Sequence, residues 1–370
     1  MAGEFDLAEL KIEDSNLAGI GSDEDKAVRK QAAEGEPAWQ GCGMQAGVEV
    51  WRVEQFKIVP WPKEEYGNFY EGDSYIVLHT TKIVKEGVES INRDIHFWLG
   101  LQSSVDEQGT AAYKTVELDD FFDGQCVQHR EVQTHESAEF KKLFKAIHYL
   151  KGGVASGFRH VGDDGTYMPR LLLAKRVSGH VHIVQVPTER DSLNQGDAFV
   201  LDGGAKIYTW FGGESSPFEK QAANTYAENI ENERSGQAKV TEADDDFWAL
   251  LGGPGEVKAA AEVPVMPEPK PVGEGVLFKL SDATGDLKCE EVGRGDLQKS
   301  MLDTASVYIC DPGNQLMVWT GNGASDRERR TAMITATKYL RFSSKPLTTP
   351  VSMVREGQAM RAPFTKIFAN

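Results

Sequence analysis

The sequence has few cysteines and no apolar run long enough to cross a membrane. Its 370 residues include four scattered cysteines, with no Cys-x-x-Cys pair: Cys42, Cys126, Cys289 and Cys310. This pattern is typical of a reduced, cytosolic protein and not of a disulfide framework. The first residues are acidic where a signal peptide would carry positive charge, and no stretch of about eighteen apolar residues occurs. We therefore expect a protein that is neither exported nor membrane-spanning.

Familiar catalytic signatures are also missing. The sequence has no Gly-x-Ser-x-Gly elbow, no P-loop and no His-Glu-x-x-His motif, and no cysteine has a histidine at a familiar family spacing. His129, His135, His148 and the pair His180 and His182 could suggest a metal site, but we interpret the pair as one face of a surface strand. The sequence therefore predicts that the chain is not an enzyme.

Positive charge is scarce, because 40 Lys and Arg residues stand against 57 Asp and Glu residues and the formal net charge is −17. A nucleic-acid binder needs a basic face, so this composition argues against one. Two local basic clusters remain, formed by Lys141, Lys142, Lys145 and Lys151 and by Arg170, Lys175 and Arg176. They could meet phosphoinositide headgroups or an acidic protein, or they could be ordinary solvated faces.

One pattern occurs three times along the chain. Each copy has an apolar strand, then a Trp near a Gly, then a glutamate nine positions after that Trp, and in the first two copies the strand follows a Gly-Asp step. The step is Gly72-Asp73 in the first copy and Gly196-Asp197 in the second, whereas Ala305 replaces the Asp in the third. The Trp and Glu pairs are Trp98 and Glu107, Trp210 and Glu219, and Trp319 and Glu328. Such repetition predicts a repeated fold.

Strand and helix patterns alternate within each copy, which predicts an α/β (α+β) fold. Alternating apolar residues predict strands over 48–61, within 66–79 and over 95–99. Helices are predicted over 219–233 and 328–341, each beginning at the repeated glutamate. A further helix is predicted over 137–150, where five apolar residues share one helical face: Phe140, Leu143, Phe144, Ile147 and Leu150.

Composition also predicts the domain boundaries. An acidic leader covers 1–46, repeat 1 covers 47–160, repeat 2 covers 161–251 and repeat 3 covers 275–370. Between the last two repeats, residues 252–274 hold five prolines, and such segments behave as extended spacers. We therefore expect a linker there and three globular repeats.

The Gly-Asp step has a chemistry that suits calcium. Calcium takes six to eight oxygen ligands from carboxylates and backbone carbonyls, and the step offers one of each. The repeated glutamate would add a second carboxylate, so Asp73 with Glu107 and Asp197 with Glu219 form two similar candidate sites. The alternative is that the Asp ends a turn and the Glu complements a helix dipole, and repetition would then follow from duplication of the fold.

Long stretches of the sequence resemble the gelsolin family. The runs VWRVEQFKIVPWP, YGNFYEGDSYIVL, KGGVASGFRHV and NQGDAFVLD are similar to the first two gelsolin repeats, and VYICDPGNQLMVWTGNGASDRERRTA resembles the third. With three repeats, the chain is most similar to the severin and fragmin type within that family. The resemblance implies, for each repeat, a mixed central sheet between a long and a short helix.

The resemblance also implies a function. We expect a calcium-regulated cytoplasmic and cytoskeletal protein, monomeric itself, that severs actin filaments and caps their barbed ends, with nucleation of assembly as a further expectation. The partners implied are actin, as monomer and filament end, and inhibitory phosphatidylinositol 4,5-bisphosphate. An actin-wedging helix is assigned to 137–150, whose Phe140, Phe144 and Ile147 could face actin or the sheet, and family matching adds Tyr113 and Phe158 as actin contacts. The alternative is a filament-side binding or crosslinking module without severing.

Site residues carry over position by position. The repeat 1 ion would use the Gly72 carbonyl, Asp73, Glu107 and the Val154 carbonyl, and an ion shared with actin would use Asp119 with the carbonyls of Gly124 and Cys126. The repeat 2 ion would use the Gly196 carbonyl, Asp197 and Glu219, whereas Ala305 leaves Glu328 in repeat 3 without a partner carboxylate. The phosphoinositide segments would be Lys145 and Lys151 and, with a better match, Arg170, Lys175 and Arg176. The resemblance also concerns a disulfide in the second repeat of the secreted form of gelsolin. Ala198 and Phe211 occupy its two positions here, which agrees with a cytosolic protein.

Overall fold

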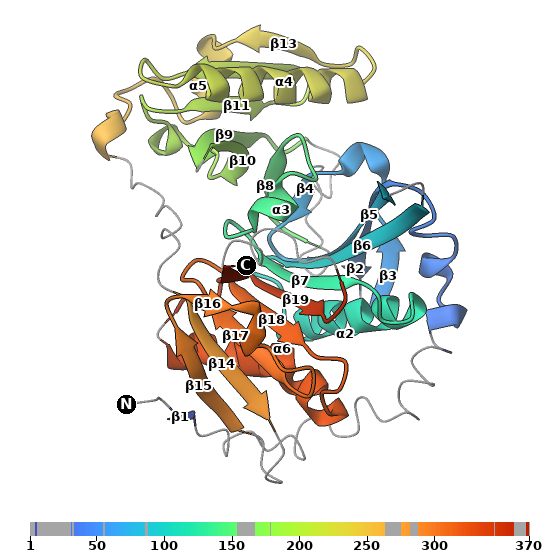
Figure 1. Cartoon of the computed structure of the whole chain (residues 1–370). Coiled ribbons are helices and arrows are strands. Elements are labelled where there is room, and N and C mark those ends of the chain that lie inside the picture. Colours follow the sequence, from blue (N-terminus) through green and yellow to red (C-terminus); the bar gives the residue numbers. More distant parts are fainter. Residues whose placement is uncertain are drawn as a thin grey trace. The chain divides into compact units, whose positions relative to one another are not determined.

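The computed structural model describes residues 4–5, 31, 33–54, 56–85, 88–153, 167–177, 179–262, 275–281, 288–343, 345–358 and 368–369. The chain divides into two compact units (Figure 1). Unit 1 comprises Met1–Lys63, Ser74–Phe140 and Pro269–Asn370, and unit 2 comprises Glu64–Asp73 and Lys141–Glu268. Most of repeats 1 and 3 thus lies in unit 1, and repeat 2 lies in unit 2. The sequence boundaries of the repeats stay predictions.

A single sheet of eleven strands runs through unit 1, in the order β1-β15-β14-β17-β18-β19-β7-β6-β5-β2-β3. The N-terminal segment and repeat 1 supply β1 (Glu4–Phe5), β2 (Gly47–Glu54), β3 (Lys57–Pro60), β5 (Ser74–Lys85), β6 (Val88–Leu99) and β7 (Val127–Val132). Repeat 3 supplies β14 (Val276–Ser281), β15 (Lys288–Arg294), β17 (Val307–Asp311), β18 (Leu316–Thr320) and β19 (Val351–Arg355). A separate parallel pair joins β16 (Leu297–Gln298) to β20 (Phe368–Ala369).

The two repeats share this sheet through one short junction. Strand β19 pairs antiparallel with β7 over three residue pairs, Val351 with Arg130, Ser352 with His129 and Met353 with Gln128. By contrast, β5 and β6 pair over twelve residues within repeat 1. Since each paired residue adds to the stability of a sheet, the three-pair junction contributes less to the sheet than the β5–β6 pairing does.

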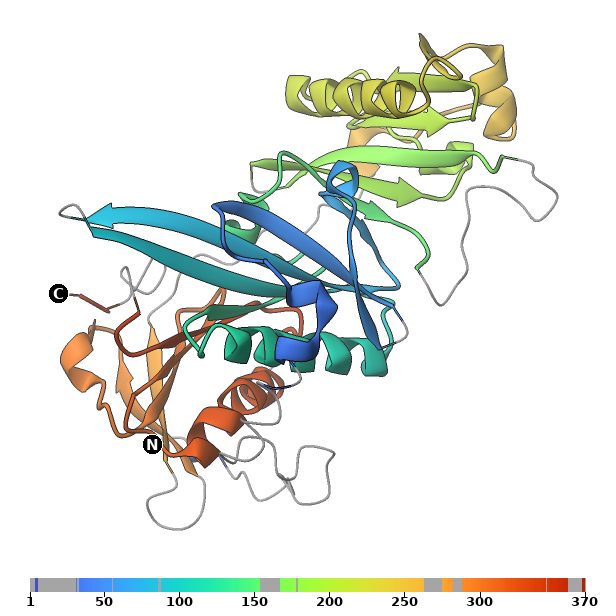
Figure 2. The ribbon, with the colours of Figure 1, turned by 90° about the vertical axis from the view of Figure 1, so that its right-hand side faces the viewer.

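Long helices cover the sheet of unit 1. Helix α2 (Val105–Phe121) packs on β2, β5 and β6, and α6 (Asp326–Phe342) packs on β14, β17, β18 and β19 (Figure 2). Short helices complete the unit: η2 (Pro37–Trp39), η6 (Lys299–Met301) and α3 (Ala138–Lys141), while η3 (Lys63–Glu65) spans the boundary between the units. Repeats 1 and 3 therefore each contribute one long helix to this unit.

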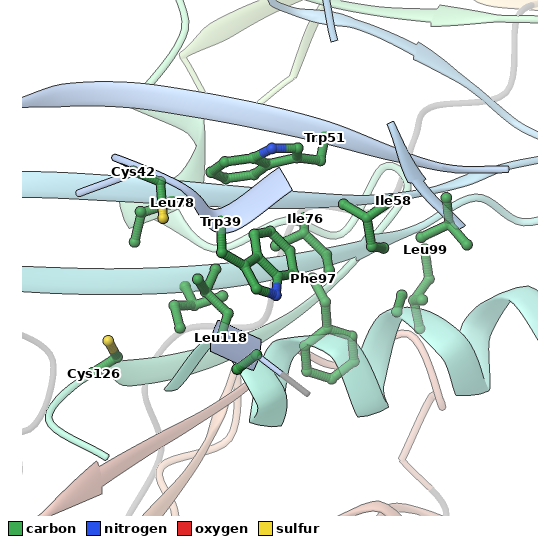
Figure 3. Packing of buried hydrophobic residues seen from close by; sticks show 14 residues of the cluster. Trp39, Cys42, Trp51, Ile58, Ile76, Leu78, Phe97, Leu99, Leu118 and Cys126 are labelled. Atoms are coloured by element: carbon green, nitrogen blue, oxygen red, sulfur yellow. The ribbon is translucent and has the colours of Figure 1, made fainter. Parts of the chain in front are cut away.

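The core of repeat 1 includes the end of the leader. Trp39 has no exposed surface and packs edge-on against Trp51, with ring centroids 5.1 Å apart (Figure 3). Its indole Nε1 donates a hydrogen bond to Glu117 of α2 at 2.9 Å. Lys114 joins this contact, because its Nζ lies 2.9 Å from both Glu117 and Glu36. The end of the acidic leader is thus part of the folded repeat.

Unit 2 contains a second sheet, in the order β13-β12-β11-β9-β10-β8-β4. Its strands are β4 (Asn68–Tyr70), β8 (Ile147–Leu150), β9 (Arg170–Val177), β10 (His180–Val186), β11 (Ala198–Asp202), β12 (Lys206–Phe211) and β13 (Lys239–Glu242). Helix α4 (Pro217–Glu233) packs on β9, β11 and β12, and the unit also contains η4 (Arg190–Ser192) and α5 (Asp245–Leu250). Strand β11 is buried along its whole length, as expected for a central strand.

The helix predicted over 137–150 is wrong. Only the four residues of α3 are helical there, and Ile147–Leu150 form strand β8, which pairs in parallel with β10 on one side and β4 on the other. The long helix of repeat 1 is α2, which begins two residues before Glu107. The helices predicted over 219–233 and 328–341 are confirmed as α4 and α6.

The first part of the predicted linker packs on unit 2. Lys258 bridges to Asn194 as in a parallel sheet, its carbonyl accepts from the Gln195 amide, and η5 (Ala260–Glu262) follows. Residues 263–274 lie outside the described residues. Within the described part of the chain, no helix combines the length and the apolar character needed to cross a membrane.

Candidate calcium sites

The three repeated glutamates share one local structure. Ser104, Ser216 and Ser325 stand three residues before Glu107, Glu219 and Glu328, and each serine hydroxyl accepts a hydrogen bond from the glutamate amide. In return, each glutamate Oε2 accepts from the serine amide at 2.9–3.1 Å. This reciprocal arrangement is a capping box. It fixes each carboxylate at a helix N-terminus, and it accounts for the repeated spacing without any metal.

In repeat 2 both candidate carboxylates are buried and occupied by protein donors. Asp197 has no exposed surface, and its Oδ1 accepts from Lys175 Nζ at 2.6 Å while Oδ2 accepts from Asn194 Nδ2 at 2.8 Å. The Oε1 atom of Glu219 accepts from the Arg176 amide at 2.8 Å. The oxygens suit a hard cation, but the Lys175 ammonium must leave before a second positive charge can approach.

In repeat 1 the predicted ligands are divided between the two units. Asp73 is buried in unit 2, where the Gly72 amide donates to the Gly152 carbonyl at 2.8 Å. A side chain at Gly153 would collide with Asp73, because an added Cβ would lie 2.5 Å from Oδ1. Glu107 lies in unit 1, and its Oε1 accepts no hydrogen bond from the residues that the structure describes. Val154 lies outside the described residues.

In repeat 3 the step has lost its carboxylate. Ala305 is exposed, and its amide donates to Oδ1 of Asp303 at 3.1 Å in a tight turn. Thr304 donates from its hydroxyl to Oε2 of Glu356 at 2.5 Å, and the Asn322 amide donates to the same oxygen at 2.8 Å. The segment that corresponds to the Gly-Asp step is therefore hydrogen-bonded, through Thr304, to Glu356 in the turn that follows β19.

The second predicted set of repeat 1 lies together at the end of α2. Asp119 is 1% exposed, and its Oδ1 accepts from the Cys126 amide at 2.8 Å. Its Oδ2 accepts from Gln128 at 2.8 Å and from Nη2 of Arg355 at 3.2 Å. Burial raises the pKa of Asp119 above its usual range, and Arg355 acts in the opposite direction. Gly124 has a φ of +70°, and its amide donates to the Asp119 carbonyl at 2.7 Å.

Another group of metal-binding residue types lies at the centre of the shared sheet. His96, His129 and Glu131 bring ligand atoms within 4.8 Å of one another and are all buried. Their polar atoms are engaged: Glu131 accepts from Ser137, His96 contacts Glu131 at 2.9 Å, and His129 contacts Asp94 and Ser352. Burial lowers the pKa of His96. The group is thus a hydrogen-bonded core network.

Of the predicted actin contacts, Tyr113 on α2 is 43% exposed. Phe140 and Ile147 are buried. Of the two orientations that the sequence allows, toward actin or toward the sheet, these two residues therefore take the second. Phe144 is half-buried and packs edge-on against Phe69 at 5.3 Å. Phe158 lies outside the described residues.

Two of the five predicted phosphoinositide residues are held in ion pairs. Arg170 is buried and bonds Asp202 at 3.1 Å, and Lys175 bonds Asp197 as described above. Arg176 is exposed, with its guanidinium 4.3 Å from the Phe218 ring centroid. Lys145 is exposed and Lys151 is half-buried.

Comparison with known proteins agrees with three copies of one mixed sheet-and-helix module. The family model described as "Gelsolin repeat" matches residues 55–141, 180–246 and 289–362, more than half of the chain. "Gelsolin-like protein 1" of Lumbricus terrestris is 40% identical over 361 residues, 96% of each chain. "Severin" of Echinococcus granulosus is 37% identical over 378 residues, 97% of each chain. "Gelsolin" of Drosophila melanogaster is 37% identical over 96% of this chain and 46% of its own.

These modules define a repeat protein built from mixed sheets with one long helix each. The chain belongs to the gelsolin family and has three gelsolin repeats, as the sequence predicts. Membership of this family also confirms that the chain is not an enzyme.

Sequence reasoning did not find the side chains that contact the candidate ligands. Asn194 lies three residues before Asp197, and its amide could have been suspected from the Asn-Gln-Gly-Asp order. Arg355 and Gln358 are 236 and 232 positions from their partners Asp119 and Cys126. No local pattern points to contacts over such separations.

Proposed function

We propose that the chain is a calcium-regulated actin-binding protein of the cytoplasm and cytoskeleton that severs filaments and caps their barbed ends. The observation that carries this proposal is the match of three gelsolin repeats together with near full-length similarity to severin and a gelsolin-like protein. The oxygen-rich positions of repeats 1 and 2 support the calcium dependence.

Three sets of oxygens would hold calcium. Asp197 and Glu219 with the Gly196 carbonyl form one set, and Asp119 with the carbonyls of Gly124 and Cys126 forms another. The third set would consist of the Gly72 carbonyl, the Asp73 and Glu107 carboxylates and the Val154 carbonyl. Bound calcium supplies concentrated positive charge to buried carboxylates. The capping boxes hold Glu107 and Glu219 in fixed orientation for that role.

Regulation would act on the joint between repeats 1 and 3. The β7–β19 pairing spans three residue pairs, and such a short pairing can open while each repeat stays folded. A ligand that binds the unpaired state more tightly shifts this equilibrium. Calcium would therefore bind more tightly when β7 and β19 of unit 1 are unpaired, and it would favour that open state.

The exposed face of α2 is the proposed actin contact. Tyr113 presents an exposed aromatic side chain there, and a helix that lies in a groove of its partner is a common recognition mode. Phosphoinositide inhibition is proposed through Lys145, Lys151 and Arg176 at the surface of unit 2, with Arg170 and Lys175 joining only after their ion pairs break.

Fluorescent actin filaments provide the test. We expect the protein to shorten filaments in micromolar calcium and to leave them intact in chelator. The Tyr113→Ala variant should keep its fold, because the side chain is 43% exposed, and should sever poorly. Phe56→Ala serves as the control, since Phe56 is 65% exposed in the same repeat but lies outside α2. Equal severing with and without calcium would overturn the regulation, and bundling without shortening would favour a crosslinking module.

A further inference from the structure

The turn that follows β19 in repeat 3 contacts the predicted cation ligands of repeat 1. We call residues 355–358, the last residue of β19 and the three residues after it, the 355–358 turn. Its Arg355 places Nη2 3.2 Å from Oδ2 of Asp119, and its Gln358 donates from Nε2 to the carbonyl of Cys126 at 3.1 Å. The same amide donates to the Gln125 carbonyl at 2.8 Å. Two of the three predicted ligand groups thus hold donors from repeat 3.

Gly124 lets the guanidinium approach. A Cβ atom at Gly124 would lie 2.2 Å from Nη1 of Arg355, so any side chain there would displace the arginine. The left-handed backbone at this residue, with φ +70°, also favours glycine. Gly124, the third residue of the predicted set, therefore leaves the space that the Arg355 guanidinium occupies.

The 355–358 turn is fixed by one hydrogen bond within the turn and by two hydrogen bonds from neighbouring parts of repeat 3. The Arg355 amide donates to Oε1 of Gln358 at 2.7 Å, which orients the Gln358 amide nitrogen toward repeat 1. Glu356 accepts hydrogen bonds from Thr304 and Asn322, and Thr304 directly precedes the Ala305 that replaces the missing Asp. Repeat 3 thus uses the place of its lost Gly-Asp step to anchor the turn.

We propose that the 355–358 turn is a built-in competitor for the cation of repeat 1: Arg355 and Gln358 fill the Asp119 site while β7 and β19 are paired, and a bound cation requires their departure. This inference rests on the proposed calcium binding and adds the residues that couple it to the β7–β19 junction. One positive charge beside a buried carboxylate stabilises it, whereas a guanidinium and a divalent cation at the same oxygens repel each other.

Solvent reaches this contact through a cleft. A cavity of about 500 Å³ is lined by Gly124, Gln125, Arg355 and Gln358, together with Asn92 and Arg93 of β6. The Arg355 side chain is 34% exposed, whereas Asp119 is 1% exposed. A cation can therefore approach from the side of the arginine, and the arginine can leave into water.

The test measures the junction without actin. Amide hydrogen exchange of β7 and β19 is followed while free calcium is raised, for the full-length protein and for Arg355→Met. We expect the calcium midpoint of opening to fall about tenfold in this variant, as for loss of one charge-assisted hydrogen bond. Arg294→Met is the matched control, because Arg294 is 56% exposed in the same repeat and bonds the neighbouring Glu291 at 2.9 Å. Its midpoint should equal that of the unchanged protein.

A double-mutant cycle in chelator separates a specific contact from general loosening. Asp119→Asn and Arg355→Met should each speed exchange at the junction, and the double variant should exchange no faster than the quicker single variant. Additive effects, or an unchanged calcium midpoint in Arg355→Met, would overturn the competitor. A different failure would count against the proposed function: no calcium response at the junction in the unchanged protein.

Discussion

The Lys175 ammonium lies 2.6 Å from Oδ1 of Asp197, a carboxylate with no exposed surface. The same relationship joins Arg355 to Asp119 in unit 1. In both places a side-chain cation touches the carboxylate that the sequence assigns to calcium. A buried carboxylate needs a positive partner, and in this structure the chain itself provides it.

Replacing Lys175 with Met should strengthen calcium binding in repeat 2. The substitution removes the competing charge while keeping most of the aliphatic length, so we expect about a tenfold gain in affinity. Without calcium the same variant should lose about 1–3 kcal/mol of stability, because the buried Asp197 carboxylate loses its positive partner. Calorimetric titration measures the first effect and urea unfolding in chelator the second.

Lys239→Met is the control for this substitution, because Lys239 is exposed on β13 of the same unit. An unchanged calcium affinity combined with weaker binding to phosphoinositide vesicles would contradict the expectation. That result would assign Lys175 to the lipid instead.

Asp197→Asn should weaken calcium binding, whereas Glu328→Gln should leave it unchanged. The first change removes a ligand charge from a set that also holds Glu219. The second alters a capping residue of repeat 3, the repeat in which Ala305 replaces the partner carboxylate, and costs about 0.5–1 kcal/mol of helix stability. Calorimetric titration of both variants gives the comparison. An equal loss of affinity in both would mean that repeat 3 binds calcium despite Ala305.

Trp39→Ala should destabilise unit 1 by about 3–5 kcal/mol, the usual cost of emptying a large core site. Trp39 is fully buried against Trp51 and bonds Glu117. Trp39→Phe should cost less, about 1–3 kcal/mol, because it keeps much of the packing and leaves the Glu117 carboxylate without its indole donor. Urea unfolding measures both. A Trp39→Ala variant as stable as the unchanged protein would show that the leader does not dock in solution.

The sequence predicts the repeat better than the junctions between repeats. The offset from Trp to Glu correctly places α4 and α6, whereas the sequence predicts the long helix of repeat 1 over 137–150 and misses α2. Helix α2 shows no clear helical spacing of apolar residues in the sequence, because its buried face includes polar side chains: Thr115, Glu117, Asp119 and Asp120. The apolar spacing of residues 147–150 predicts a helix, but pairing with β4 and β10 overrides that local preference.

The candidate site divides in the same way. The sequence identifies Asp197 and Glu219 because they lie in a repeated motif, and the structure buries both in unit 2. It could not identify Arg355 or Gln358 as neighbours of Asp119 and Cys126. That contact depends on the β7–β19 pairing, which joins residues more than two hundred positions apart and leaves no pattern in either segment.

Acid should weaken unit 2 through two histidines, the half-buried His148 and the buried His182. Burial lowers the pKa of His148 to about 3 and that of His182 to about 4, whereas an unfolded histidine titrates near 6.5. The folded form therefore binds protons less readily, so stability is full above the unfolded pKa of about 6.5 and falls as the pH drops below it. At pH 5 we expect a loss of about 2 kcal/mol for each histidine. Amide exchange of β8 and β10 in chelator, compared at pH 7 and 5 with correction for the intrinsic rate, measures this loss. The double variant His148→Gln with His182→Gln should remove most of the difference, while His135→Gln, an exposed position in unit 1, should retain it. A double variant with the full acid sensitivity would place the responsible groups elsewhere.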